Sequence, residues 1–347
     1  MKFLSGIAIY LLLIVITTGC KNEPKTVITT PEERALTETP DVFAVDLNGD
    51  KLTRWKEADS VWAAREKDVE IARSAYLGKT EDPKTLLRYA KAYSMTGRVE
   101  NAIDLLNRGV QTFPDIADFY TSRGENLLLS RQLGDCVDNF WKAGQKMEKG
   151  ANKGLLPPTG DDSIAGVTLA YKNYFLMAMS FFCNNDLSSA DKFFEVCGDF
   201  STNSDLWART YYWQYACYSR SGRTEDAKAI LKNLSENMQI LPVSKPYIES
   251  LKYYKGTISE ADLVDASFEP KSRAGAEAWR IRMYAVGVKN LLNNNKDKAL
   301  NTFMTIKNKG FWYSMVNLAA ETELMRLAGK KYEEPEKIEL NSKEKKK

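Results

Sequence analysis

The sequence YSMTGRVENA at residues 93–102 recurs as YSRSGRTEDA at residues 218–227. Each copy has a glycine followed by an arginine in its middle and an alanine at its end. The glycine indicates a tight turn, and the acidic residues after it are typical of the first turn of a helix. Each copy therefore predicts the end of one helix, a turn and the start of a second helix. Recurrence of such a unit is the sequence signature of a repeat protein.

The residues around both copies resemble the tetratricopeptide repeat (TPR), a helix–turn–helix unit of about 34 residues. In the frame that begins at Pro83, the matching positions are Leu86, Ala90, Tyr93, Gly97, Ala102, Leu106, Gly109 and Pro114. In the frame that begins at Ala117, they are Tyr120, Gly124, Leu127, Cys136, Phe140 and Ala143. Ala102 and Cys136 are separated by 136 − 102 = 34 residues, one repeat length.

Three further frames carry parts of the same pattern. The predicted hairpins lie near 83–116, 117–147, 171–204, 208–240 and 280–310. Two insertions interrupt them, at 148–163, where glycine and proline exclude a regular helix, and at 241–278, where two shorter helical pieces flank Gly256.

The predicted fold is all-α, a TPR-like helical-hairpin solenoid over residues 46–331. A helical hairpin cannot bury both of its apolar faces alone, so neighbouring hairpins and capping helices must cover it. An amphipathic pattern over 53–76 predicts an N-terminal capping helix, and 311–327 predicts a C-terminal one. The alternative is that a capping face forms the contact between two copies of the chain in a homodimer.

The N-terminus is typical of an export signal. Lys2 precedes an apolar run over residues 3–16, which is shorter than a bilayer-spanning helix requires. Gly19 and Cys20, which follow the run, resemble a bacterial lipobox, although Thr17 stands where an aliphatic residue is more usual. We expect a signal peptide at 1–19 and acylation of Cys20, which anchors the chain to a membrane. The alternative is a general secretory signal with an incidental cysteine.

The two ends of the mature chain are predicted to lack a core. Residues 20–45 are rich in Thr, Pro and Glu and predict a flexible tether. Residues 332–347 predict a charged tail, solvated rather than bound to lipid. Many lipoproteins that stay at the inner membrane have an Asp directly after the acylated cysteine. In this chain that position is Lys21. We therefore expect the outer membrane, facing the periplasm, with the cell surface as the alternative.

Composition excludes several classes of function. The chain has no histidine, so it lacks the commonest general base and metal ligand. Its 49 basic and 46 acidic residues give a net charge of +3, which does not favour nucleic acid. We expect no enzymatic activity, no cofactor and no metal. Residues 46–53 are similar to a calcium loop, but Lys51 replaces the required glycine, so a turn and helix start is favoured.

Four cysteines follow the lipidation site, and their state has two interpretations. Each falls in a predicted helix, and most fall at helix crossings where a small apolar side chain fits. Buried free thiols are therefore favoured, although an exported chain could also form disulfides. The four are Cys136, Cys183, Cys197 and Cys217.

The densest aromatic cluster, at 207–218, is the candidate binding site. In TPRs the first helix of each hairpin lines a concave groove, and the frame places aromatic rings beside arginines there. Such pairs suit recognition of a peptide or a sugar through stacking and bidentate hydrogen bonds. The alternative is ordinary packing and solvated charge. The candidate groove residues are Arg88, Lys91, Arg209, Tyr212, Trp213 and Arg220.

Residues 253–263, followed by a last hairpin and an apolar helix, resemble the C-terminal half of the NlpI-type TPR lipoproteins of Gram-negative outer membranes. This resemblance covers about a quarter of the chain and consists of scaffold residues. It implies an adaptor that gathers envelope proteins or their peptide segments, commonly as a homodimer. The main alternative is a surface lipoprotein that binds glycans or other ligands through its aromatic groove. The third hypothesis is a hydrolase that acts through carboxylates alone.

Overall fold

The computed structural model describes residues 42–53, 58–147, 154–156, 166–235, 238–265, 267–269, 272–309 and 312–333. The predicted signal peptide, Cys20, most of the tether and nearly all of the charged tail lie outside these residues. So does most of the insertion at 148–163. In the described part of the chain, no helix has the length and apolarity needed to cross a membrane.

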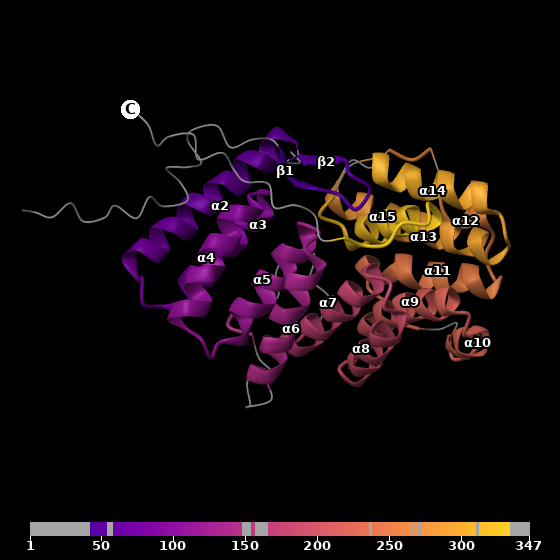
Figure 1. The fold of residues 1–347 in the computed structure, drawn as a ribbon, viewed down its shortest axis with the longest axis horizontal. Coiled ribbons are helices and arrows are strands. Elements are labelled where there is room, and N and C mark those ends of the chain that lie inside the picture. The colour runs from indigo at the N-terminus through magenta and orange to yellow at the C-terminus, as the bar shows by residue number, and fades with distance from the viewer. Residues whose placement is uncertain are drawn as a thin grey trace, which may run out of the picture. The chain divides into compact units, whose positions relative to one another are not determined.

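Five helical hairpins make up most of the described chain (Figure 1). The two helices of each hairpin pack against each other. They are α3 (Pro83–Met95) with α4 (Val99–Thr112), α5 (Ala117–Leu129) with α6 (Leu133–Met147), α7 (Leu169–Cys183) with α8 (Leu187–Asp199), α9 (Ser204–Ser221) with α10 (Thr224–Lys232), and α13 (Arg273–Leu292) with α14 (Lys296–Asn308). All five lie where the repeat pattern predicts a hairpin.

The turn inside each hairpin has the same backbone geometry. One residue adopts a left-handed conformation, and the next N–H donates to the carbonyl five residues before it, as in a Schellman helix end. Asparagine and glycine tolerate this conformation, whereas a long side chain such as arginine rarely adopts it. The left-handed residues are Gly97, Arg131, Asn185, Gly222 and Asn294. The five hairpins therefore share one turn geometry.

Glycines permit the close approach of helices at three crossings. A Cβ atom added at Gly124 would lie 2.6 Å from the ring of Phe140, and one at Gly287 would lie 2.5 Å from the ring of Phe303. A Cβ atom added at Gly109 would likewise clash with the ring of Phe119 in the next hairpin. A larger residue would push the helices apart, so the small positions of the repeat pattern are needed for packing.

Further helices complete the array. The helix α2 (Asp59–Gly78) packs on α3 and buries Val69 and Tyr76, as expected of a cap. Between the fourth and fifth hairpins lie η2 (Pro242–Ser244), α11 (Lys245–Lys255) and α12 (Glu260–Leu263). The helix α11 packs against both α9 and α13, so this insertion joins the core of the array.

Two short strands replace the turn and helix start that the sequence favoured at residues 46–53. Strand β1 (Val42–Val45), which begins inside the expected tether, pairs antiparallel with β2 (Lys51–Thr53). The Asp46 carboxylate closes their turn by accepting hydrogen bonds from the N–H groups of Asn48 and Asp50, at 2.8 and 2.9 Å. Phe43 packs 4.2 Å from Trp312, ring centroid to centroid. Burial against this distant residue stabilises the hairpin, and no local pattern reveals it.

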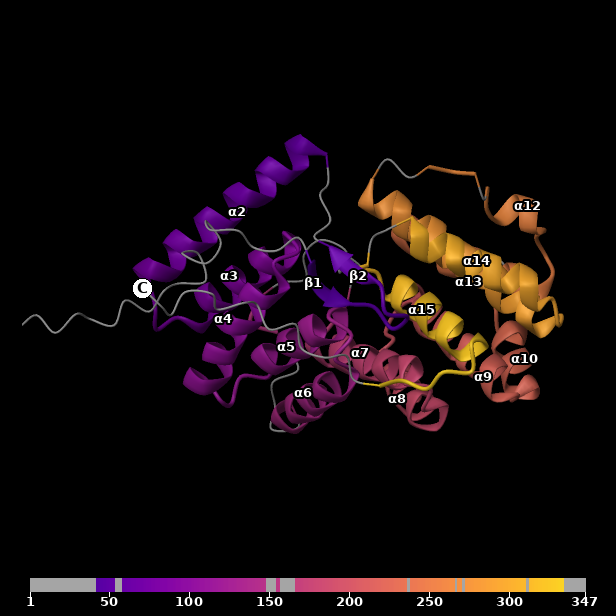
Figure 2. The ribbon, with the colours of Figure 1, turned by 45° about the horizontal axis from the view of Figure 1, so that its top comes forward.

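The last helix does more than cap the fifth hairpin. The helix α15 (Met315–Leu327) packs against α13, α14 and also α7 (Figure 2). Every residue from Val316 to Met325 is buried, so no face of this stretch is left to solvent. A capping helix normally keeps one polar face exposed. The helix α15 is therefore buried between the third and fifth hairpins and is not a terminal cap.

Candidate functional site on the first helices of the hairpins

Tyr212 and Trp213 are core residues, so the prediction that they line an open groove is wrong. Tyr212 is fully buried and Trp213 is 1% exposed. The Tyr212 hydroxyl donates to the Ile281 carbonyl at 2.7 Å, and burial raises the pKa of Tyr212 well above its usual value. Trp213 packs edge-on against Phe182 and lies 5.3 Å from the Tyr284 ring. The helices α11 and α13 cover this part of α9, which explains the burial.

Arg209 and Arg220 also contact their own chain. The Arg209 guanidinium lies 4.1 Å above the Phe175 ring. Arg220 has only 3% of its side chain exposed, and its Nε lies 2.9 Å from an oxygen of Glu323 on α15. Its Nη1 donates to the carbonyl of Phe182 at 3.1 Å. The predicted combination of arginines with aromatic rings exists. The carboxylate that pairs with Arg220, however, belongs to this chain and not to a partner.

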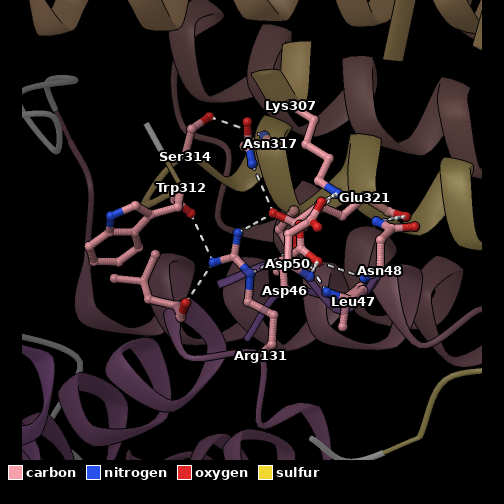
Figure 3. Close-up of polar contacts among 12 residues, drawn as sticks. Asp46, Leu47, Asn48, Asp50, Arg131, Lys307, Trp312, Ser314, Asn317 and Glu321 are labelled. Carbon is pink, nitrogen blue, oxygen red and sulfur yellow. Dashed lines mark hydrogen bonds and ion pairs between the residues drawn. The ribbon is translucent and has the colours of Figure 1, made fainter. Parts of the chain in front are cut away.

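Arg131 forms a second buried contact with α15 (Figure 3). Its Nε donates to Glu321 Oε2 at 3.0 Å, and its Nη2 pairs with Glu321 Oε1. Its Nη1 donates to the carbonyls of Leu129 and Trp312, at 2.6 and 2.8 Å. Both charged side chains are fully buried. Arg131 is therefore held in its left-handed turn by contacts from α15 and from the segment before it.

The residues that form hydrogen bonds and ion pairs with α15 come from four hairpins. Besides Arg131 and Arg220, the Tyr284 hydroxyl donates to Glu323 at 3.3 Å, and the Cys183 carbonyl accepts from Thr322 at 3.3 Å. We call Arg131, Cys183, Arg220 and Tyr284 the α15 seat. Buried ion pairs add little net stability, because each charge loses its hydration, but removing one partner is strongly destabilising. The seat therefore fixes the position of α15.

The β-hairpin closes over the same helix. The Leu47 N–H donates to Glu321 Oε2 at 3.4 Å, and the Asn48 side-chain amide donates to the Glu321 carbonyl at 3.2 Å. The Lys307 ammonium lies 2.9 Å from Asp46 and also pairs with Asp50 (Figure 3). The carboxylates of the calcium-like loop thus bind a lysine of this chain. Throughout the described residues, no group of potential ligands could hold a metal ion.

The first helix of the first hairpin is more accessible. Lys84, Arg88 and Lys91 lie at positions i, i+4 and i+7 of α3, on one side of the helix. Lys84 and Arg88 are exposed, and Lys91 is half-buried. We call these three residues the cationic stripe. Arg88 and Lys91 belong to the predicted groove, but α3 packs against α2, α4 and α5, whereas α9 packs against α8, α10, α11 and α13. The six predicted residues therefore do not form one site.

The four described cysteines are buried free thiols, which confirms the favoured interpretation. Burial raises the pKa of Cys183 and of Cys217 to about 12. The Cys136 thiol donates to the Leu133 carbonyl at 3.1 Å. A thiol with a raised pKa is a poor nucleophile at neutral pH, so these groups contribute packing rather than chemistry.

Arg131 is not among the predicted site residues, although the repeat frame contains a signal for it. In the aligned frames, the turn position is Gly97, Arg131, Asn185, Gly222 and Asn294. A bulky charged residue at a position that requires a left-handed backbone is costly, so its presence indicates a compensating contact. Nothing in the sequence identified Glu321 as that contact.

The repeated turns and the glycine crossings define an all-α protein of the TPR-like helical-hairpin class. No protein-family model matches the chain. No curated protein matches it. Among solved structures, it is similar to YrrB, a TPR protein with an unusual peptide-binding site, at 12% identity and a TM-score of 0.39, covering 70% of this chain and 93% of that chain. It is also similar to the TPR domain of P58(IPK), at 14% identity and a TM-score of 0.25, covering 78% and 79% of the two chains.

Proposed function

We propose that this protein is a membrane-anchored scaffold that binds protein partners through the cationic stripe of α3. The observation that carries the proposal is the contrast between two sets of first helices. The α15 seat is filled by this chain, whereas Lys84 and Arg88 remain exposed on α3. Two exposed cations on one side of a helix favour a segment rich in Asp and Glu, because carboxylates pair with them across an interface.

Cys20 supplies the membrane anchor in this proposal. Acylation at this residue would hold the scaffold at the bacterial outer membrane, facing the periplasm. The partners are then envelope proteins or their peptide segments. The absence of histidine in the whole sequence supports a role in binding rather than catalysis.

The stripe is tested by charge reversal. Wild type and the double variant Lys84→Glu, Arg88→Glu are crosslinked in intact cells and purified from solubilised envelope, and the proteins recovered with each are quantified. We expect specific partners to be enriched by wild type and reduced at least tenfold with the variant. The matched control is Lys330→Glu, Lys331→Glu, which reverses two exposed charges after α15 and should leave the recovery unchanged. Equal recovery with all three forms would refute the stripe as the binding surface.

The anchor is tested separately by metabolic labelling with a palmitate analogue. Label should be incorporated into wild type and lost in Cys20→Ser. Incorporation that persists in Cys20→Ser would contradict lipidation at this residue, whatever the result for the stripe.

A further inference from the structure

Trp141 differs from the other tryptophans that the structure describes. Its side chain is 56% exposed, whereas Trp62 and Trp207 are half-buried and Trp213, Trp279 and Trp312 are buried. It lies on α6, the second helix of its hairpin, and outside both the α15 seat and the cationic stripe. An exposed indole leaves a large apolar face in water and a polar N–H at its edge.

The indole of Trp141 rests on a base of other aromatic rings. Phe193 meets it edge to face, with 6.4 Å between ring centroids. Phe193 in turn stacks on Phe181 at 5.5 Å and on Tyr174 at 6.3 Å. These contacts join α6 to α7 and α8 and restrict the rotation of the exposed ring. A ring that is already held loses little conformational entropy when a ligand covers it.

Two exposed polar side chains flank the indole on the same helix. Asp138 precedes Trp141 by three residues and Gln145 follows it by four, so all three lie on one side of α6. Asp138 and Gln145 form no hydrogen bond or ion pair with other described residues. They span about 10 Å along the helix axis. The carboxylate accepts hydrogen bonds, and the carboxamide both donates and accepts them.

The rings beneath Trp141 are half-buried, and the indole is the exposed ring of this cluster. Across the described residues of α5 to α9, Trp141 is the one exposed large apolar side chain. Its exposed neighbours at positions 138, 142 and 145 are an acid, a lysine and an amide. An exposed flat ring between hydrogen-bonding groups matches a ligand with an apolar face and a polar edge.

We propose that Trp141, Asp138 and Gln145 form a binding site for a neutral oligosaccharide. The C–H face of one pyranose ring stacks on the indole. Hydroxyl groups of the sugar donate to the Asp138 carboxylate and exchange hydrogen bonds with the Gln145 amide. The distance between the two polar groups exceeds one sugar ring, so the site takes a chain of sugars. This binding activity is additional to the scaffold function and uses a different surface.

The test uses the full chain, cellohexaose and chitohexaose as probes, and the indole N–H resonances of 15N-labelled protein. The Trp141 resonance is assigned by its loss in Trp141→Phe. We expect one of the two sugars to shift this resonance in a saturable way, with binding at least tenfold weaker in Trp141→Ala and several-fold weaker in Asp138→Asn. Leu300→Ala, which removes an exposed apolar side chain on α14, is the matched control and should bind as wild type does.

Two results would overturn the proposal. The first is the absence of saturable shifts with both sugars, or shifts whose affinity is unchanged in Trp141→Ala. The second comes from sedimentation velocity without sugar. Self-association that is lost in Trp141→Ala would show that the indole is a contact between two copies of this chain. Circular dichroism of each variant confirms that the helices remain folded.

Discussion

Helix α3 and helix α9 occupy the same place in their hairpins but meet different neighbours. On α3, Lys84 and Arg88 face solvent, whereas on α9, Tyr212 and Trp213 are buried and Arg220 pairs with Glu323 of α15. The difference shows that the repeat determines the hairpin, while elements outside the repeat determine what its first helix can bind. In this chain, α11, α13 and α15 cover the later first helices.

The turns of two hairpins show the same division between repeat and context. Asn294 and Arg131 both have a left-handed backbone, with φ of 59° and 66°. Asn294 is exposed, whereas Arg131 is fully buried and paired with Glu321. Glycine would suit the backbone at both positions. The two positions therefore allow the contribution of the α15 seat to be separated from the preference of the turn.

The largest effect is expected for Arg131→Gly. The substitution relieves the backbone but leaves Glu321 buried without its cation, which typically costs about 3–5 kcal/mol. The free energy of unfolding, measured by urea denaturation, should fall by that amount. Asn294→Gly, the matched control, should be neutral or stabilise by less than about 1 kcal/mol. Equal effects of the two substitutions would show that the turn, and not the contact with α15, governs position 131.

A smaller effect is expected at the helix crossings. In Gly124→Ala, the new methyl group would lie 2.6 Å from the ring of Phe140, and overpacking of this kind costs about 1–3 kcal/mol. Gly78→Ala, at the end of α2, adds a methyl group with no atom within 4 Å and should stabilise slightly. Thermal unfolding of both variants measures the difference. A Gly124→Ala protein as stable as wild type would contradict the close crossing of α5 and α6.

The smallest effect concerns pH and the buried thiols. The pKa of Cys183 and of Cys217 is raised from 9.0 in the unfolded chain to about 12. The unfolded thiols therefore ionise first, and their contribution to stability is complete below pH 9 and lost as the pH rises toward 12. Each thiol should lower the free energy of unfolding by about 1 kcal/mol between pH 9 and 10.

Urea denaturation at pH 8, 9 and 10 measures this dependence. The double variant Cys183→Ala, Cys217→Ala should show a shallower fall than wild type, since the two titrating groups are absent. The same fall in the free energy of unfolding in both proteins would contradict the raised pKa of the two thiols. Mass spectrometry provides a second measure, because iodoacetamide at pH 8 should label neither thiol in the folded protein.

The hairpins could be predicted from the sequence because their signals are local. The turn residues, the small crossing positions and the helix starts fall within about 34 residues of one another. The contacts that cover the first helices are not local. Arg131 and Glu321 are 190 residues apart, and Leu47 and Glu321 are 274 residues apart. No periodic pattern connects such residues.

The aromatic cluster of α9 illustrates the limit of pattern analysis at the site. Tyr212 and Trp213 have the spacing of groove residues, and the same spacing suits a core. Their burial depends on α11 and α13, whose positions follow from tertiary packing and not from the repeat. Arg88, which the repeat frame places on a first helix, is exposed, and its part in a groove stays a prediction. Trp141 was not singled out, because an isolated tryptophan in a helical frame is usually a core residue.

The most direct test of the central claim is amide hydrogen exchange of α15, measured by mass spectrometry on the intact protein. If α15 fills the seat, its amides between Val316 and Met325 should exchange only through global unfolding, as slowly as those of α7 and far more slowly than those of α2. Exchange of α15 as fast as that of α2 would contradict the account, because it would show that the later first helices are accessible to a partner.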